Sequence, residues 1–269
     1  MELKVNSKIV YAATGGRVHE PNRPLVVLVH GAGLDHTVWA LQSRWLAFHG
    51  FNVVAVDLPS HGHTPGTCLT DIGAMADWIG AVVTSLDLGA ACLIGHSMGA
   101  LVALETAARF SKQVASLTLI GAAAAMPVHP DLLAQAQANH HDAIDMVNLW
   151  GFGAAAGLGG SASPGLWMTG VGERLLERGK PGVLYTDLAA CNAYQGALAA
   201  AQSLEIPVLL VSGSADVMTP LRGARALAEA CRQARVVVVE GAGHMLMSER
   251  PYDVQAALGS HLKMGARAA

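Results

Sequence analysis

A serine between two glycines, at the junction of a predicted strand and a predicted helix, constrains the fold of this chain most. The pentapeptide GHSMG occupies residues 95–99, after the apolar run 90–94 and before the helical pattern of 100–108. The glycines permit a turn so tight that the residue between them takes unusual backbone angles. Such a turn lifts the Oγ atom of Ser97 above the edge of a sheet, where a base can reach it.

Buried strands are predicted for six short apolar runs, which are continuous rather than alternating, as in parallel strands covered on both faces. They are Leu25–Val29, Val53–Val56, Ala91–Ile94, Leu117–Ile120, Val208–Val211 and Val236–Val239. Helical patterns lie between or after them, at Trp39–His49, Thr70–Leu86, Ala100–Phe110, Leu221–Cys231 and Pro251–Leu262. The alternation predicts an α/β fold with a mostly parallel, doubly wound sheet. Residues 3–13 are expected to add an antiparallel edge.

The segment between Ile120 and Ile206 interrupts this alternation, because it has helical stretches, at 131–138 and 187–201, but no clear strand. A structureless loop of that length is uncommon in a compact domain. We therefore expect a helical cap, residues 123–204, inserted over a core made of residues 1–122 and 205–269. The glycine-rich run 151–161 inside the cap is either a hinge or a surface linker.

Composition excludes several classes of protein. Hydrophobic residues make up 52% of the 269 residues and charged residues 14%, which favours a folded globular chain over a disordered one. The formal net charge is −3 with no long run of one sign, so neither nucleic acid nor an anionic membrane is an expected partner. No apolar stretch predicts a membrane span, and the N-terminus does not resemble a secretory signal.

Cysteine and histidine spacing gives no sign of a metal or cofactor. The four cysteines lack C-x-x-C spacing and are predicted to be reduced thiols of a cytoplasmic protein. His61 and His63 flank a glycine, a spacing that suggests a ligand pair only weakly. We favour a loop at the sheet edge for them, and expect no metal and no organic cofactor.

A serine is a poor nucleophile unless a base lies beside it. His244 follows the last predicted strand and therefore lies at the same carboxyl edge of the sheet as Ser97. Asp216 follows the strand before it and is expected to accept the Nδ1–H of the histidine. The order Ser97, Asp216, His244 suits a nucleophile on a strand-to-helix turn. Glu240 is too close to the strand end, and Glu249 lies on the wrong side of the histidine loop.

An oxyanion formed at Ser97 needs two hydrogen-bond donors. The N–H of Met98 is one. The N–H of Ala32, in the small-residue loop 30–33 after the first buried strand, is expected to be the other. His30 is expected to brace this loop, and His96 to point away from the serine in a structural role.

Five segments, in order and spacing, resemble the α/β-hydrolase superfamily over nearly the full length of the chain. They are His30–Gly33, Asp57–Gly62, Gly95–Gly99, Gly213–Asp216 and Gly241–His244. One departure is Ser60, where many relatives carry glycine, in a loop away from the triad. The chain is most similar to the small, capped, cofactor-free members: carboxylesterases, enol-lactonases, carbon–carbon bond hydrolases and haloperoxidase-like esterases. The serine at 97 disfavours the haloalkane dehalogenases and epoxide hydrolases of this fold, which use an aspartate nucleophile.

The resemblance implies a serine hydrolase that cleaves a small or medium carboxylic ester through an acyl-enzyme. Trp150, Met126 and Met245 are expected in the wall of an apolar substrate pocket between cap and sheet. Further apolar cap residues are candidates for the same wall, or pack the cap onto the core: Leu149, Phe152, Leu166, Trp167 and Met168.

Besides a non-hydrolytic enzyme on the same triad, such as a lyase or a perhydrolase, two other interpretations remain open. One is a carbon–carbon bond hydrolase or enol-lactonase of aromatic degradation. A carbon–carbon hydrolase needs basic groups for its substrate carboxylate, but Arg174, Arg178 and Lys180 resemble a solvated helix face. The other is a ligand-binding member of the superfamily that turns over slowly. The sequence does not determine the oligomeric state.

Overall fold

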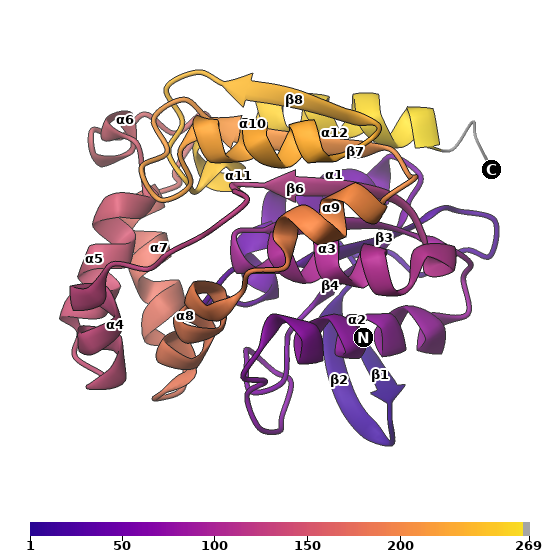
Figure 1. Ribbon diagram of the computed structural model, residues 1–269, viewed down its shortest axis with the longest axis horizontal. Coiled ribbons are helices and arrows are strands. Elements are labelled where there is room, and N and C mark those ends of the chain that lie inside the picture. Colours follow the sequence, from indigo (N-terminus) through magenta and orange to yellow (C-terminus); the bar gives the residue numbers. More distant parts are fainter. Residues whose placement is uncertain (266–269) are drawn as a thin grey trace.

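One sheet of eight strands forms the centre of the molecule in the computed structural model, which describes residues 1–265 (Figure 1). The strand order is β1-β2-β4-β3-β5-β6-β7-β8. β1 (Glu2–Val5) and β2 (Lys8–Ala13) form the antiparallel edge, and β2 is also antiparallel to β4. All other pairs are parallel, so the predicted α/β fold with its antiparallel edge is confirmed.

The parallel strands lie close to their predicted positions. They are β3 (Leu25–Val29), β4 (Asn52–Val56), β5 (Ala91–His96), β6 (Val114–Ile120), β7 (Val208–Gly213) and β8 (Ala234–Val239). Every residue of β3, β4, β5 and β7 is buried. The prediction that the last strand is buried on both faces is wrong. Among the described residues β8 pairs only with β7, and of its six residues only Val239 is buried, because the strand lies at the edge of the sheet.

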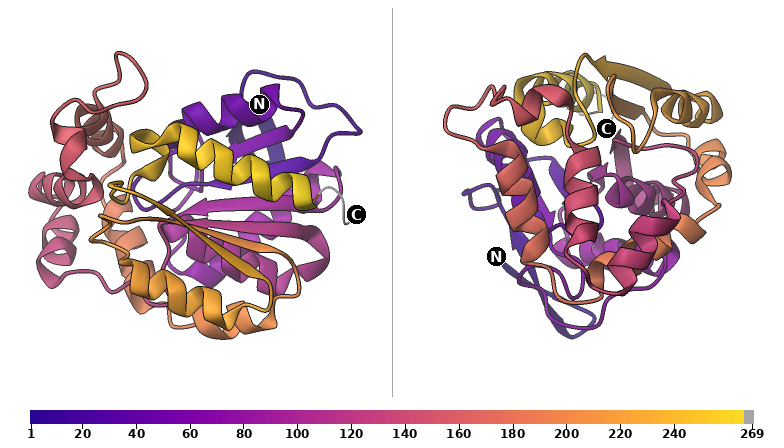
Figure 2. Two further views of the ribbon diagram at one scale, coloured as in Figure 1. Left: turned by 90° about the horizontal axis from the view of Figure 1, so that it is seen from above. Right: turned by 90° about the vertical axis from the view of Figure 1, so that its left-hand side faces the viewer.

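Helices cover both faces of the sheet (Figure 2). α2 (Ile72–Leu86), α3 (Met98–Arg109) and α10 (Leu221–Ala230) pack on the face that includes Val27 and Val29. α1 (Ala40–Phe48) and α12 (Pro251–Gly265) pack on the opposite face, which includes Val26 and Leu28. Successive residues of β3 thus supply two different cores, as the pleat of a strand requires. Short helices η1 (His36–Trp39), η2 (Ser111–Gln113) and α11 (Leu246–Glu249) complete these layers.

Six helices lie between β6 and β7: α4 (Pro130–Gln137), α5 (Asp142–Gly151), α6 (Ala154–Gly157), α7 (Met168–Glu177), α8 (Val183–Ala193) and α9 (Ala197–Ser203). Figure 1 shows α4, α5, α7 and α8 grouped beyond the carboxyl ends of the parallel strands. We call these four the inserted helices. Among the described residues, no helix combines the length and apolarity needed to cross a bilayer.

The prediction of one helix over 187–201 is wrong. α8 ends at Ala193, Tyr194 is extended, and α9 begins at Ala197. The break changes the direction of the chain, because α8 packs beside α4 whereas α9 packs on α3 and α10 against the sheet. The hydroxyl of Tyr194 donates to Glu105 on α3 at 2.5 Å, which anchors the break.

Candidate active site

Ser97 stands at the apex of the turn between β5 and α3, with φ of 54° and ψ of −120°. A Cβ atom at Gly95 would lie 2.1 Å from the carbonyl oxygen of Gly99, and one at Gly99 would lie 2.3 Å from that of Val29. Only glycine fits either position. The Ser97 N–H donates to the carbonyl of Ile120 at 2.9 Å, which fixes the turn to the neighbouring strand. The strained serine turn predicted from the sequence is therefore present.

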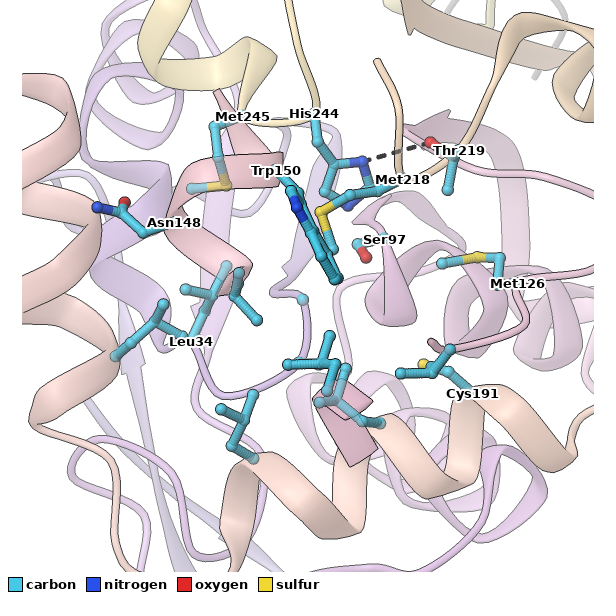
Figure 3. A pocket seen from close by; sticks show the side chains of 18 of the residues that line it. Leu34, Ser97, Met126, Asn148, Trp150, Cys191, Met218, Thr219, His244 and Met245 are labelled. Atoms are coloured by element: carbon cyan, nitrogen blue, oxygen red, sulfur yellow. Dashed lines mark hydrogen bonds between the residues drawn. The ribbon is translucent and has the colours of Figure 1, made fainter. Parts of the chain in front are cut away.

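His244 and Asp216 form a buried pair above the same edge of the sheet, 2.9 Å apart from Nδ1 to Oδ2. Asp216 also accepts hydrogen bonds from the N–H groups of Met218 and Thr219 at 2.9 and 2.8 Å, and from the Thr219 hydroxyl at 2.6 Å. A carboxylate only accepts, so Nδ1 of the histidine carries the hydrogen. Nε2 of His244 is left without a protein partner among the described residues, and both His244 and Ser97 line one cavity (Figure 3).

The environment keeps Asp216 ionised. Burial by itself raises the pKa of this carboxyl, but the charge and hydrogen bond of His244 and the bonds from Thr219 outweigh it. The net effect is a pKa below the ordinary value. The sequence analysis did not identify Thr219 as a partner of Asp216. A threonine three residues after an aspartate, in a loop before a helix, is the sequence pattern that predicts such a hydrogen bond.

Two neighbouring histidines are neutral and structural. His30 accepts from the Leu58 N–H at 3.1 Å through Nε2, so its Nδ1 donates to the Gly31 carbonyl at 2.9 Å and braces the loop as expected. Burial lowers the pKa of His30 to about 4. His96 donates to the carbonyl of His244 at 3.0 Å, and burial lowers its pKa to about 3. The expectation that His96 points away is wrong, because its ring lines the cavity 4.8 Å from that of His244.

Two backbone N–H groups close to Ser97 are free. Ala32 lies in a turn closed by the Leu34 N–H and the Gly31 carbonyl at 3.2 Å. Met98 begins α3 directly after the serine. Within residues 1–265, neither amide has an acceptor in the protein. Free amides at a buried helix start and in an adjacent turn form a ready anion site.

A cavity of about 390 Å³ opens over the serine, between the sheet and the inserted helices. Trp150, Met126 and Met245 all line it, together with Met218 and Ser97 (Figure 3). Among the described residues, its wall contains no lysine, arginine, aspartate or glutamate.

The residues that line the cavity differ in part from those predicted from the sequence. Of the other apolar cap residues considered, only Phe152 lines the cavity, whereas the side chains of Leu149 and Trp167 are largely exposed. Sequence reasoning missed one side of α8, which contributes Leu184, Leu188 and Cys191. Their spacing of four and three residues was the available signal.

Charged and metal-ligating groups named from the sequence lie elsewhere. Arg174 pairs with Glu177 on its own helix, and Arg178 pairs with Asp35 at 2.9 Å. Neither arginine, nor Lys180, lines the cavity. The His61 and His63 side chains diverge. The ring of His63 lies against Tyr11, and Nε2 of His61 lies 2.8 Å from Asp187 on α8.

Comparison with known proteins agrees with this geometry. The model of the alpha/beta hydrolase family matches residues 26–258, so the chain belongs to that family. A pimeloyl-[acyl-carrier protein] methyl ester esterase of Neisseria meningitidis serogroup B is 32% identical over 239 residues, 81% of this chain and 85% of the relative. A protein of the same name from Aromatoleum aromaticum is 31% identical over 248 residues, 86% of this chain and 95% of the relative. The protein is an esterase-type member of the family.

Solved structures show the same fold. The enol-lactonase of Burkholderia xenovorans LB400 superimposes with a TM-score of 0.88 at 23% identity, covering 98% of this chain and all of the other. An esterase from Exiguobacterium antarcticum gives a TM-score of 0.84 at 18% identity, covering 98% and 99%. At these identities the likeness concerns the arrangement of the sheet, its helices and the insertion.

Proposed function

We propose that the protein hydrolyses neutral carboxylic esters with an apolar acyl chain, using Ser97 as nucleophile, His244 as base and Asp216 as its partner. The observation that carries the proposal is the buried His244–Asp216 pair next to a serine at positive φ, over a cavity whose wall, among the described residues, holds no lysine, arginine or carboxylate. A serine, a base and an oriented acid in this chain order form the nucleophile-elbow type of triad.

The mechanism is acyl transfer in two steps. His244 takes the hydroxyl proton through Nε2 as the Ser97 oxygen attacks the ester carbonyl. Asp216 stabilises the imidazolium that results, because its carboxylate already accepts from Nδ1. The free N–H groups of Ala32 and Met98 bind the oxyanion. His244 then protonates the leaving alcohol, and water activated by the same imidazole releases the acid.

The apolar wall supports a neutral substrate. A second carboxylate on the substrate would lie in this cavity without a lysine or arginine partner among the described residues, and an unpaired charge removed from water is strongly disfavoured. This argues against a carbon–carbon hydrolase that holds a dienoate, and against lactones with free carboxylates. Relatives named methyl ester esterases support an ester bond with a small alcohol group.

Residues 123–204 supply 14 of the 24 residues that line the cavity, which supports the division into a core (1–122 and 205–269) and a cap (123–204). Residues 266–269 of the core segment lie outside the described residues. All four cysteines are free thiols, which supports a reducing compartment, and we propose the cytoplasm. The proposed reaction uses protein groups, a small-molecule ester and water.

The test is steady-state hydrolysis of p-nitrophenyl acetate, butyrate and octanoate by the wild type and Ser97→Ala, together with labelling by a fluorophosphonate. We expect turnover and labelling in the wild type and neither in the variant. Turnover retained by Ser97→Ala would refute the assignment of Ser97 as the nucleophile. A folded wild type that binds octanoate esters without hydrolysing them would favour a ligand-binding protein.

A comparison of monomethyl and dimethyl esters of one dicarboxylic acid tests the charge argument. The neutral dimethyl ester should be hydrolysed with the higher kcat/KM. Preference for the anionic monoester would contradict the proposed substrate class.

A further inference from the structure

A buried carboxylate on the inserted helix α8 joins that helix to two loops of the core. Asp187 is fully buried within the stripe of α8 that lines the cavity. Its Oδ2 accepts from the Gly33 N–H at 2.8 Å and lies 2.8 Å from Nε2 of His61, and its Oδ1 accepts a weaker bond from the Cys68 thiol at 3.6 Å. A carboxylate in such a position is stable only when paired and hydrogen-bonded.

The hydrogen-bond pattern makes His61 the cation of this pair. Its Nδ1 lies 3.1 Å from the carbonyl oxygen of Pro59, and its Nε2 faces the carboxylate of Asp187. Both partners only accept, and a neutral imidazole has one N–H, so both bonds require the doubly protonated ring. Burial opposes this charge, but the hydrogen bond and charge of Asp187 outweigh it and raise the pKa of His61. Asp57 and the neutral His30 are the other titratable groups near the ring.

The Gly33 amide belongs to the turn that carries Ala32. Gly31 and Leu34 close the turn, and Gly33 has φ of +68° while Ala32 has no positive φ, which is the pattern of a type II turn. Such a turn differs from type I by a flip of its central peptide. The bond from the Gly33 N–H to Asp187 fixes that peptide and ψ of Ala32, and so holds the Ala32 Cα atom to which the adjoining peptide with the Ala32 N–H is joined.

The turn is therefore held from two sides. His30 donates to the Gly31 carbonyl from the core, and Asp187 accepts from the Gly33 amide from the insertion. A Cβ atom at Gly33 would lie 2.9 Å from a methyl carbon of Leu184, so the turn also presses against α8. The Ala32 N–H lies between these two anchors and has no acceptor of its own within residues 1–265.

We propose that Asp187, paired with His61, is a positioning residue for the oxyanion site: through Gly33 it aims the Ala32 N–H at the reacting carbonyl. The inference rests on the proposed function. It links docking of α8 to catalysis, because the turn loses one anchor whenever α8 moves away. A metal ion is a poorer occupant of the His61–Cys68–Asp187 cluster, since the ring nitrogens and Oδ2 are already used in bonds to one another, Pro59 and Gly33.

The experiment compares Asp187→Leu, which removes the acceptor at similar size, with Asp187→Asn, which keeps one oxygen. Tyr194→Phe is the matched control, because its hydroxyl also joins the end of α8 to the core but does not touch the turn. Asp187→Leu should lower kcat about 10- to 100-fold at nearly constant KM, as misplacement of one oxyanion donor predicts. Asp187→Asn should lower kcat less than Asp187→Leu does, and Tyr194→Phe should leave kcat unchanged.

Two further readouts separate positioning from a merely structural role. Affinity for a trifluoromethyl ketone, whose serine adduct places an oxyanion in the site, should fall by the same factor as kcat, whereas affinity for a matched alcohol product should not change. The ¹⁵N signals of the His61 ring should show two protonated nitrogens in the wild type and lose that signature in Asp187→Asn. These two measurements on Asp187→Asn decide the matter if Asp187→Leu fails to fold.

Three outcomes would overturn the inference: unchanged kcat and ketone affinity in both Asp187 variants, an equal loss of kcat in Tyr194→Phe, or a neutral His61 ring in the wild type. A wild type that neither hydrolyses esters nor forms the ketone adduct would instead refute the proposed function, and the inference with it. If the wild type hydrolyses esters and the Asp187 variants keep its kcat and ketone affinity, the inference is refuted and the proposed function stands.

Discussion

Two buried carboxylates tie the insertion to the two core loops of the site, and they do so with different electrostatics. On the oxyanion side, Asp187 of α8 binds the turn of Gly33 and forms an ion pair with His61. On the histidine side, Glu249 of the core accepts from Gly243 at 3.0 Å and from Gly153 of the insertion at 2.9 Å. Within the described part of the chain, the hydrogen-bond donors to Glu249 are backbone N–H groups, and burial raises its pKa.

The two carboxylates anchor the insertion to the core in different ways, and the two ways have opposite electrostatic consequences. An ion pair keeps its carboxylate charged at the cost of burying a second charge. A carboxylate held only by N–H groups avoids that second charge but binds a proton more readily. The histidine loop has a second tie, from the Met245 N–H to the Gly151 carbonyl at 2.8 Å. Both ties reach the glycine-rich run 151–161, so its first residues are anchored to the loop of the proposed base.

The largest effect is expected on the histidine side. Asp216→Asn should lower kcat by about 10⁴, the order seen when a triad aspartate is replaced and the histidine takes the wrong tautomer. The fold should remain, because an amide still fills the site. Steady-state kinetics and circular dichroism check this. A rate near that of the wild type would assign the acid role to another residue.

Glu249→Ala should cost about 2–4 kcal/mol of unfolding free energy, because it leaves the buried N–H groups of Gly153 and Gly243 without an acceptor. The activity of the folded fraction should also fall, since the His244 loop loses a support. Denaturant unfolding and active-site titration measure the two effects. A cost close to that of a surface substitution would show that Met245 and Gly151 hold the loop without the carboxylate.

Stability should fall as the pH rises through the raised pKa of His61. The folded state holds this proton more tightly than the unfolded state, whose pKa is near 6.5, so the contribution is complete below 6.5 and is lost above the folded pKa. Unfolding free energies of the wild type and Asp187→Asn across this window test the sign. An identical pH dependence in both would mean that His61 is not the cation of the pair.

The smallest expected effect is the pH dependence of stability that comes from Glu249, whose carboxylate, unlike that of Asp187, has no cationic partner within residues 1–265. Because burial raises the pKa of Glu249, wild-type stability should decrease as the pH rises from 4.5, its ordinary value, to the folded pKa. Glu249→Gln should remove this slope at a modest cost in stability at low pH. Thermal melts of the two proteins from pH 4 upward check it. A wild-type stability that rises through the same window by more than the variant's would mean that folding lowers the pKa of Glu249.

Local patterns in the sequence were sufficient for the sheet and for the spacing of the proposed triad. Continuous apolar runs predicted strands such as β3 because a strand covered on both faces needs apolar residues at every position. The glycines around Ser97 predicted the turn because no other residue fits there. The edge position of β8 was not predictable, since its apolar run resembles that of a buried strand and only the pairing order leaves it exposed.

The hydrogen bonds that connect the insertion to the site join residues that lie far apart in the chain. In the sequence, Asp187 is one polar residue of a predicted helix, and its partners Gly33 and His61 lie 154 and 126 positions away. Glu249 is an acid on the wrong side of a histidine, but the fold brings Gly153 to it. Chain periodicity reports which face of an element is apolar. It does not report which buried polar groups meet, because that depends on how the inserted helices pack over the carboxyl ends of the strands.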